Sequence, residues 1–251
     1  MNKIIKQSEL EHSFKHAARL ALSGTREERS GRSGGSPADI AMRLRNELRI
    51  ATLNWATVEA FNATFEGFRD RLIAEDAWQA PMFGVRAMAR DVIMTLMHVT
   101  DGPGHDYDRE TICRFVGLFN GGTSHEIAEA TGASEANVAE GLSYLRARVP
   151  ALWGKNHPLP GNRELADIRT RFEPIRNRLL AHAQVYSSLD LRRDVPKTRE
   201  FLRLVSRLSD AACMICNVPR DDLQDRWDGA FAEAERFWKI VAVGVSQPSS
   251  E

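Results

Sequence analysis

The chain has 251 residues, 43% of them hydrophobic, which is enough apolar material for one large domain or two small ones. Lysine plus arginine and aspartate plus glutamate each number 34, so no overall charge points to a nucleic-acid or membrane partner. No apolar run approaches the roughly 18 residues of a membrane span, and residues 1–10 lack a cleavable signal. A cytoplasmic protein with no membrane partner is therefore expected.

The N-terminal part predicts an arm ahead of the main domain. Residues 2–23 have a helical pattern, and a linker rich in glycine, serine and arginine follows up to Pro37. The linker has no apolar side chain to bury, so it is expected to be flexible. Residues 1–37 are accordingly assigned to the arm, and residues 38–246 to a helical domain.

Three helical segments come next. Residues 39–76 indicate one bent helix or two, with aromatic side chains whose simplest role is packing. Residues 82–99 predict a helix that is closed by the breaker cluster at residues 101–104. Residues 108–119 predict a short amphipathic helix with Asp108 as its N-cap.

Residues 123–148 predict a helix-turn-helix-like hairpin, with its turn at residues 131–134 and Ser134 capping the second helix. This stretch contains four acidic and two basic residues, and a recognition helix that carries Glu140 would repel phosphates. A DNA-binding regulator is therefore the least favoured function. The hairpin is interpreted as an insert used for packing, substrate placement or partner contact.

The remaining segments are a proline- and glycine-rich loop over residues 150–161, a helix from Glu164, and two helices over residues 196–218 and 219–244. No alternating strand pattern occurs, so the predicted fold is all-α, a helical bundle. Cys213 and Cys216 form a C-x-x-C pair without a second ligand pair, and we interpret them as small core residues. No cofactor and no metal ion is expected.

An arginine and a histidine lie six positions apart in the helix that begins at Glu164. Its apolar residues recur at spacings of three and four, and His182 occupies one place in this series, whose apolar members are Leu165, Ile168, Phe172, Ile175, Leu179 and Tyr186. The histidine thus lies on the buried or interfacial face, where a charged group is costly without a partner.

Arg176 and His182 are the residue types that metal-independent RNA cleavage requires. A histidine can take a proton from a ribose 2′-hydroxyl, and a guanidinium group can stabilise the charge that develops on phosphorus. Residues 163–203 contain ten basic and six acidic residues, which favours an anionic partner such as RNA. The simpler alternative is that Arg176 and Arg178 pair with acids such as Glu173 and that His182 is a satisfied core histidine. Spacing alone favours this alternative.

Helix geometry adds a constraint on this pair. Six residues advance the helix by about 600°, which leaves Arg176 and His182 about 120° and about 9 Å apart. Arg176 and His182 of one copy can therefore not easily bind the same phosphate, whereas the arginine of one copy could approach the histidine of a second copy. A catalytic motif therefore predicts a homodimer formed through the motif helix. Pro174 lacks the N–H of a helical hydrogen bond and could bend this helix.

The run Ile175-Arg176-Asn177-Arg178-Leu179-Leu180-Ala181-His182 resembles the arginine-polar-x-x-x-x-histidine signature of the HEPN superfamily, in particular its abortive-infection AbiU-type branch. A second segment, residues 89–103, resembles the first core helix of that branch, including its internal aspartate and its terminal Asp-x-Pro-like break. Together the two segments cover roughly residues 83–190, with the hairpin of residues 123–148 between them.

The resemblance implies a four-helix HEPN core, dimerisation through the motif helices, and often an endoribonuclease toxin in phage defence or in a toxin–antitoxin pair. It assigns the catalytic roles to Arg176 and His182, with Asn177 as the polar residue of the motif. The arginines expected to bind the RNA backbone are Arg171, Arg178, Arg192 and Arg193. A non-catalytic HEPN module that docks a partner, such as a nucleotidyltransferase-type antitoxin protein, is the alternative function.

Overall fold

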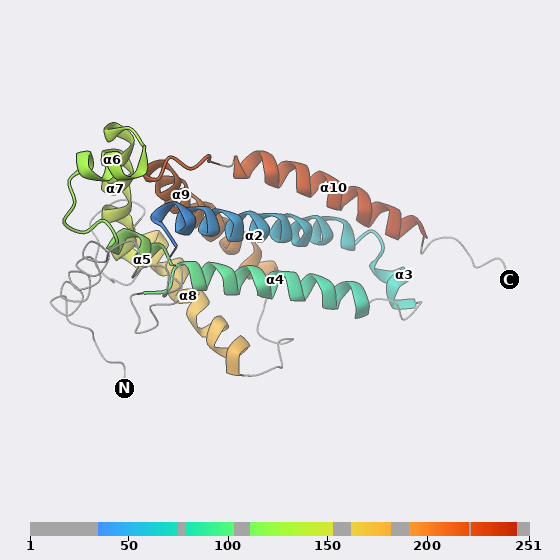
Figure 1. Ribbon diagram of the computed structural model, residues 1–251. Helices are drawn as coiled ribbons and strands as arrows, with labels where there is room; N and C mark the ends of the chain where they lie inside the picture. The colour runs from blue at the N-terminus through green and yellow to red at the C-terminus, as the bar shows by residue number, and fades with distance from the viewer. Residues whose placement is uncertain are drawn as a thin grey trace. The chain divides into compact units, whose positions relative to one another are not determined.

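The computed structural model describes residues 35–74, 79–102, 111–152, 162–181, 191–220 and 222–244. Its elements are α2 (Pro37–Phe65), α3 (Arg69–Ala74), α4 (Gln79–Val99), α5 (Ile112–Gly117), α6 (Ser124–Thr131), α7 (Glu135–Arg148), the 3-10 turn η1 (Val149–Leu152), α8 (Asn162–Ala181), α9 (Leu191–Ile215) and α10 (Leu223–Gly244), as drawn in Figure 1. These ranges contain no strand, which confirms the predicted all-α fold. The helix predicted over residues 2–23 and the linker up to residue 34 lie outside them.

The described residues group into two compact units. The first unit contains the described residues within 1–46, 97–170 and 204–221, and the second those within 47–96, 171–203 and 222–251. No described helix is long and apolar enough to cross a membrane.

The pattern over residues 39–76 forms two helices, α2 and α3, separated by a turn at residues 66–68. The start of α2 is fixed by Ser36, whose amide and hydroxyl both donate to Asp39 Oδ2 at 2.8 Å. These hydrogen bonds hold the pKa of Asp39 below its ordinary value, because they favour the charged carboxylate. Pro37 occupies the first helical position, where its missing N–H costs nothing.

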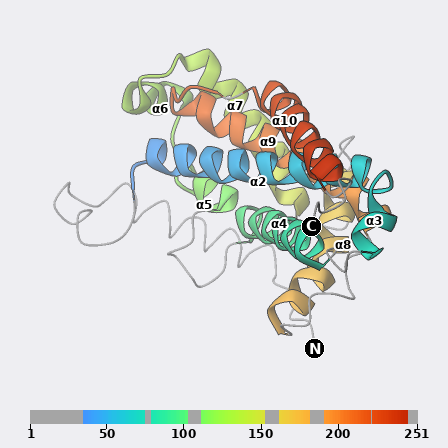
Figure 2. The ribbon, with the colours of Figure 1, turned by 90° about the vertical axis from the view of Figure 1, so that its right-hand side faces the viewer.

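Aromatic rings form a large part of the core of the second unit. The Phe61 ring of α2 lies 4.8 Å from the Trp238 ring of α10, centroid to centroid, and is also in contact with Phe65 and Phe68. Figures 1 and 2 both place α10 alongside α2. Because Phe61, Phe68 and Trp238 are all buried, the interpretation of these aromatic residues as packing residues is confirmed.

The hairpin predicted in the first unit is also confirmed. Thr123 and Glu126 form a capping box at the start of α6, and Gly132 ends it in the left-handed conformation with φ of 71°. The Ser134 hydroxyl accepts from the amide of Asn137 at 3.2 Å and caps α7, as predicted. The two helices pack on each other, and Ile127 of α6 and Val138 of α7 are both buried.

Three predicted helix starts are wrong. The N-cap of α5 is Thr111, whose hydroxyl accepts from the Arg114 amide at 3.1 Å, and not Asp108. Helix α9 begins at Leu191 and continues through Pro196, whose ring is exposed, so one lost hydrogen bond is tolerated there. Helix α10 begins at Leu223 and not at Pro219, because Asp222 Oδ1 accepts two amides of its first turn at 3.0 and 3.1 Å.

The cysteines are core residues. Cys113, Cys213 and Cys216 are all buried and none is in a disulfide. Burial raises the pKa of the Cys113 thiol to about 12, and burial together with the neighbouring Cys213 does the same for Cys216. Both thiols therefore stay protonated and unreactive at neutral pH, which agrees with the packing interpretation of the C-x-x-C pair.

Candidate active site

Arg176, the first residue of the arginine–histidine motif, belongs to the last two turns of α8, which ends at Ala181. The Arg176 side chain is half-buried, and its Nε atom is fully covered. Asn177 and Arg178 continue the helix, but their side chains lie outside the described part of the structure. His182, one position beyond the last residue of α8, lies outside it entirely. Of the predicted catalytic side chains, the structure therefore describes Arg176.

The apolar face predicted for this helix is confirmed over its described length, where Leu165, Ile168, Phe172 and Ile175 are each no more than 8% exposed. In the second unit, the Phe172 ring stacks on Phe201 of α9 with centroids 5.7 Å apart and planes inclined by 8°. Arg176 follows Ile175 directly, so it lies about 100° around the helix from a buried residue. The aliphatic part of the Arg176 side chain therefore lies at the edge of the packed face.

The other predicted RNA-binding arginines are described to different extents. Arg171 is half-buried on α8, and five residues place it about 140° around the helix from Arg176. Arg192 and Arg193 belong to the first turn of α9, with side chains outside the described part. Helix α8 continues through Pro174, which is exposed.

A largely buried ion pair anchors the part of α8 that belongs to the first unit. Arg169 Nη2 lies 3.6 Å from Asp101 Oδ1, with the arginine side chain 10% and the aspartate side chain 20% exposed. Asp101 lies two residues after Val99, the last residue of α4, at the break that closes the segment of residues 89–103. Because charges this far from water are costly unless they are compensated, the pair holds α8 to the end of α4.

Sequence reasoning missed this pair, although the sequence contained a signal for it. Arg169 comes one position after Ile168 and three before Phe172, so the helical period places it beside the apolar face. An arginine in that position requires an acidic partner. The partner, Asp101, is remote in sequence and only the fold identifies it.

A second buried charge, also missed, lies in the second unit. Glu59 Oε1 accepts from Trp55 Nε1 at 2.8 Å, and its Oε2 lies 3.5 Å from Arg199 Nη1. The Arg199 guanidinium group in turn lies 3.8 Å from the centroid of the Trp227 ring. Burial raises the pKa of Glu59, and the attraction of Arg199 and the Trp55 hydrogen bond oppose this rise only in part. This arrangement connects α2, α9 and α10.

Within the described residues, no three histidine, cysteine, aspartate or glutamate side chains come together in a way that could hold a metal ion. Among the described side chains of the motif, the Arg176 guanidinium group is the one that can bind an anion.

No family model, no curated protein and no solved structure matches this chain.

Proposed function

We propose that this chain is a metal-independent endoribonuclease of the HEPN type. The main support is the ion pair between Arg169 and Asp101, because it holds α8, the helix that carries Arg176, to the end of the segment of residues 89–103. Further support comes from the all-α fold and from Arg176, which is anchored on a continuous helix six positions before His182.

The proposed chemistry assigns one role to each residue of the motif. His182 takes the proton from a ribose 2′-hydroxyl, and the resulting oxygen attacks the adjacent phosphorus. The Arg176 guanidinium group stabilises the negative charge on the phosphorane oxygens. The bond to the 5′-oxygen breaks, and this oxygen takes a proton from water, which leaves a 2′,3′-cyclic phosphate and a 5′-hydroxyl; His182 then releases its proton to solvent. Asn177 follows the arginine as a polar residue that can orient the phosphate.

The biological role that follows is a toxin or a phage-defence effector that acts on RNA, held in check by an antitoxin protein. The basic excess of residues 163–203 supports an RNA substrate, since backbone binding depends on positive charge near the motif.

Activity of the purified chain on RNA tests this proposal. The wild type, incubated with RNA in EDTA, is expected to produce fragments with 2′,3′-cyclic phosphate ends, which mass spectrometry identifies. His182→Ala and Arg176→Ala are each expected to lose at least about a hundredfold in rate, because each removes one element of acid–base or charge stabilisation.

Arg236→Ala is the matched control, because Arg236 is exposed on α10 and its loss also removes one positive charge. It should cleave at the wild-type rate. Intact RNA with the wild type, or equal cleavage by the wild type and His182→Ala, would show that the motif is not catalytic.

The second candidate function is a non-catalytic module that docks a partner protein. It is favoured by two large apolar side chains one turn apart on α10, Phe237 at 56% and Ile240 at 71% exposure. Copurification of a stable complex from the native host, with no RNase activity in EDTA and no effect of His182→Ala, would support this function over catalysis.

A further inference from the structure

The hairpin of α6 and α7 is left without a role by the proposed ribonuclease, and its surface differs from what the sequence indicates. The charge count over residues 123–148 gives an excess of two acids. However, the count takes no account of which face of α7 each charge occupies, or of basic residues that other segments bring to it.

Most acidic residues of the hairpin lie on α6 and at the start of α7. Glu126 is engaged in the capping box with Thr123, where it accepts from the Thr123 amide at 2.9 Å. Glu129 and Glu135 lie 3.5 and 3.6 Å from the two ring nitrogens of His125. Three of the four acids are therefore gathered at α6 and at the first residue of α7.

The opposite flank of α7 presents neutral and basic side chains. Taking Asn137 as the origin, the helical period places Tyr144 and Arg148 within about 20° of it, and Glu135 about 160° away. The Arg148 guanidinium carbon lies 5.7 Å from the centroid of the Tyr144 ring. Glu140, about 60° from Asn137, is the nearest acid on the helix. We call the side of α7 formed by Asn137, Tyr144 and Arg148 the Asn137 flank.

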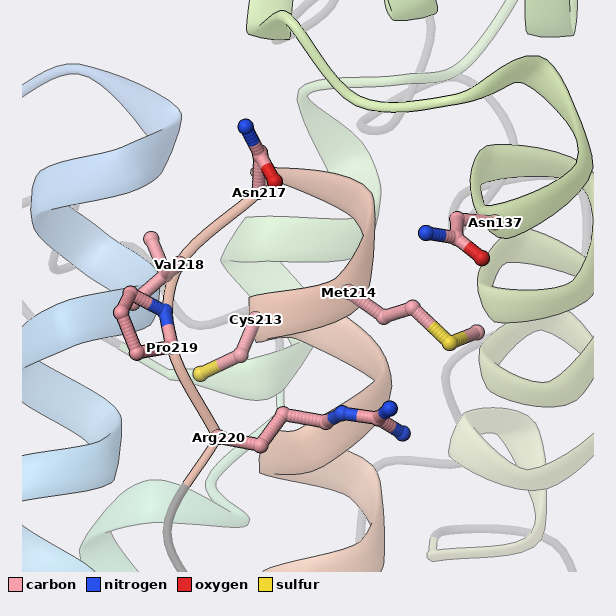
Figure 3. A pocket seen from close by; sticks show the side chains of 7 residues that line it. All are labelled: Asn137, Cys213, Met214, Asn217, Val218, Pro219 and Arg220. Carbon is pink, nitrogen blue, oxygen red and sulfur yellow. The ribbon is translucent and has the colours of Figure 1, made fainter.

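A pocket of about 260 Å³ lies beside the Asn137 flank, within the first unit. Its lining residues include no acid and come from α7, the end of α9 and the segment after it: Asn137, Cys213, Met214, Asn217, Val218, Pro219 and Arg220. Figure 3 shows Asn137 pointing across the pocket toward Met214, with the Arg220 guanidinium group extending to the same side. We call it the Arg220 pocket.

The backbone around the Arg220 pocket is held in place from both sides. Asn217 has a positive φ of 51°, which turns the chain sharply after α9. The carbonyl oxygen of Pro219 accepts from Arg45 Nη1 of α2 at 2.6 Å. On the opposite wall, α7 approaches α9 closely at Gly141, where an added Cβ would lie 2.7 Å from Ile215. Arg220 therefore projects from an anchored segment beside a fixed helix.

We propose that α7 binds the major groove of duplex DNA and that the Arg220 pocket receives a backbone phosphate. The Arg220 guanidinium group and the Asn137 side-chain amide are donors that can bind phosphate oxygens. The exposed face of α7 next to the Asn137 flank carries small residues and one acid: Ala136, Ala139, Ser143, Ala147 and Glu140. Such a helix can enter the wide major groove of B-form DNA, but not the narrow one of A-form RNA.

This proposal is independent of the ribonuclease, since DNA lacks the 2′-hydroxyl that the proposed cleavage consumes. Binding of a fluorescently labelled short DNA duplex to the full-length chain, followed by anisotropy at several salt concentrations, provides the test. We expect the wild-type affinity to fall linearly with salt on logarithmic axes. Arg220→Gln should weaken binding roughly tenfold at low salt and lower the salt slope by about 1, because one phosphate contact is lost.

Three further variants sharpen the result. Arg220→Lys should retain most of the affinity, because a lysine still contacts a phosphate. Glu140→Gln should tighten binding, since it removes the acid nearest the Asn137 flank. Arg203→Gln is the matched control, an exposed arginine of α9 in the other unit, and should bind like the wild type.

Absence of duplex binding at low salt, or equal losses in Arg220→Gln and Arg203→Gln, would overturn the proposal. An RNA duplex bound as tightly as the DNA duplex would overturn the groove assignment. Inorganic phosphate bound in an Arg220-dependent manner by a chain that ignores duplex DNA would instead identify a site for free phosphate.

Discussion

Single residues of this chain carry buried charges that are compensated to different degrees. Arg169 has its counter-charge 3.6 Å away in Asp101. Glu59 has two donors, Trp55 and Arg199, yet the pKa of its carboxyl group stays above the ordinary value because burial outweighs both. Two different responses to substitution follow from this difference.

Asp101→Asn is expected to destabilise the chain by about 3 kcal/mol, because it removes the negative charge 3.6 Å from the buried Arg169 guanidinium group. The urea midpoint of unfolding, followed by circular dichroism, measures this loss. Replacing both partners, as Arg169→Met with Asp101→Leu, should recover most of it, since a well-packed apolar pair avoids the cost of desolvating charge.

The exposed pair of Arg69 and Glu66, 3.7 Å apart, is the matched control for Asp101→Asn. Glu66→Gln should change stability by no more than about 0.5 kcal/mol, because water screens the pair. If Asp101→Asn were as neutral as Glu66→Gln, the ion pair of Arg169 and Asp101 would not hold α8 to the end of α4.

Glu59→Gln is expected to change the pH dependence of stability. Folding raises the pKa of Glu59 above its ordinary value of 4.5. Between the unfolded and the folded pKa value, the folded state therefore binds more protons than the unfolded state. The wild type therefore loses stability as the pH rises through the window between the two pKa values, and the glutamine variant does not. Urea unfolding at several pH values from about 4 to about 7 measures the difference. If the difference in the free energy of unfolding between the two proteins were the same at every pH, or favoured the wild type at higher pH, the raised pKa of Glu59 would be contradicted.

At the scale of whole elements, the sequence predicts helix ends and turns correctly where the cap or turn is formed by neighbouring residues. Gly132 and Ser134 identified the hairpin turn, because a left-handed glycine and a capping serine act within a few residues of themselves. The start of α9 was misplaced because Pro196 suggested a boundary, whereas its exposed position lets the helix pass. The partner of Arg169 and the basic side chain beside α7 come from remote segments, so only packing reveals them.

The close contact of α7 with α9 makes a prediction about glycine. In a helix, alanine is normally favoured over glycine by about 1 kcal/mol. Gly141→Ala should nevertheless destabilise the chain, because its Cβ would lie 2.7 Å from Ile215 Cγ1 and 3.0 Å from the Ala211 carbonyl oxygen.

Gly229→Ala on α10 is the matched control, because no atom lies within 4 Å of the added Cβ. It should stabilise the chain by roughly 0.5–1 kcal/mol. Urea unfolding of both variants measures the contrast, and two variants that shift in the same direction would contradict the close approach of α7 and α9.

At the scale of the whole molecule, the proposed ribonuclease requires more than one copy of the chain. The sequence predicts a helix on which Arg176 and His182, six positions apart, point about 120° away from each other. A two-fold axis near the motif would bring the arginine of one copy to the histidine of the other. The site would then be shared, and each copy would contribute to two sites.

A shared site predicts that two inactive variants restore activity when they form mixed dimers. In a dimer of Arg176→Ala with His182→Ala, one of the two sites receives both intact residues, and the other receives neither. Random mixing produces mixed dimers in half of the population, so about a quarter of the wild-type rate should return. The two variants are unfolded and refolded together, and RNA cleavage is measured against each variant refolded alone. Recovery near zero, while crosslinking shows that mixed dimers have formed, would place both residues of each site in one copy.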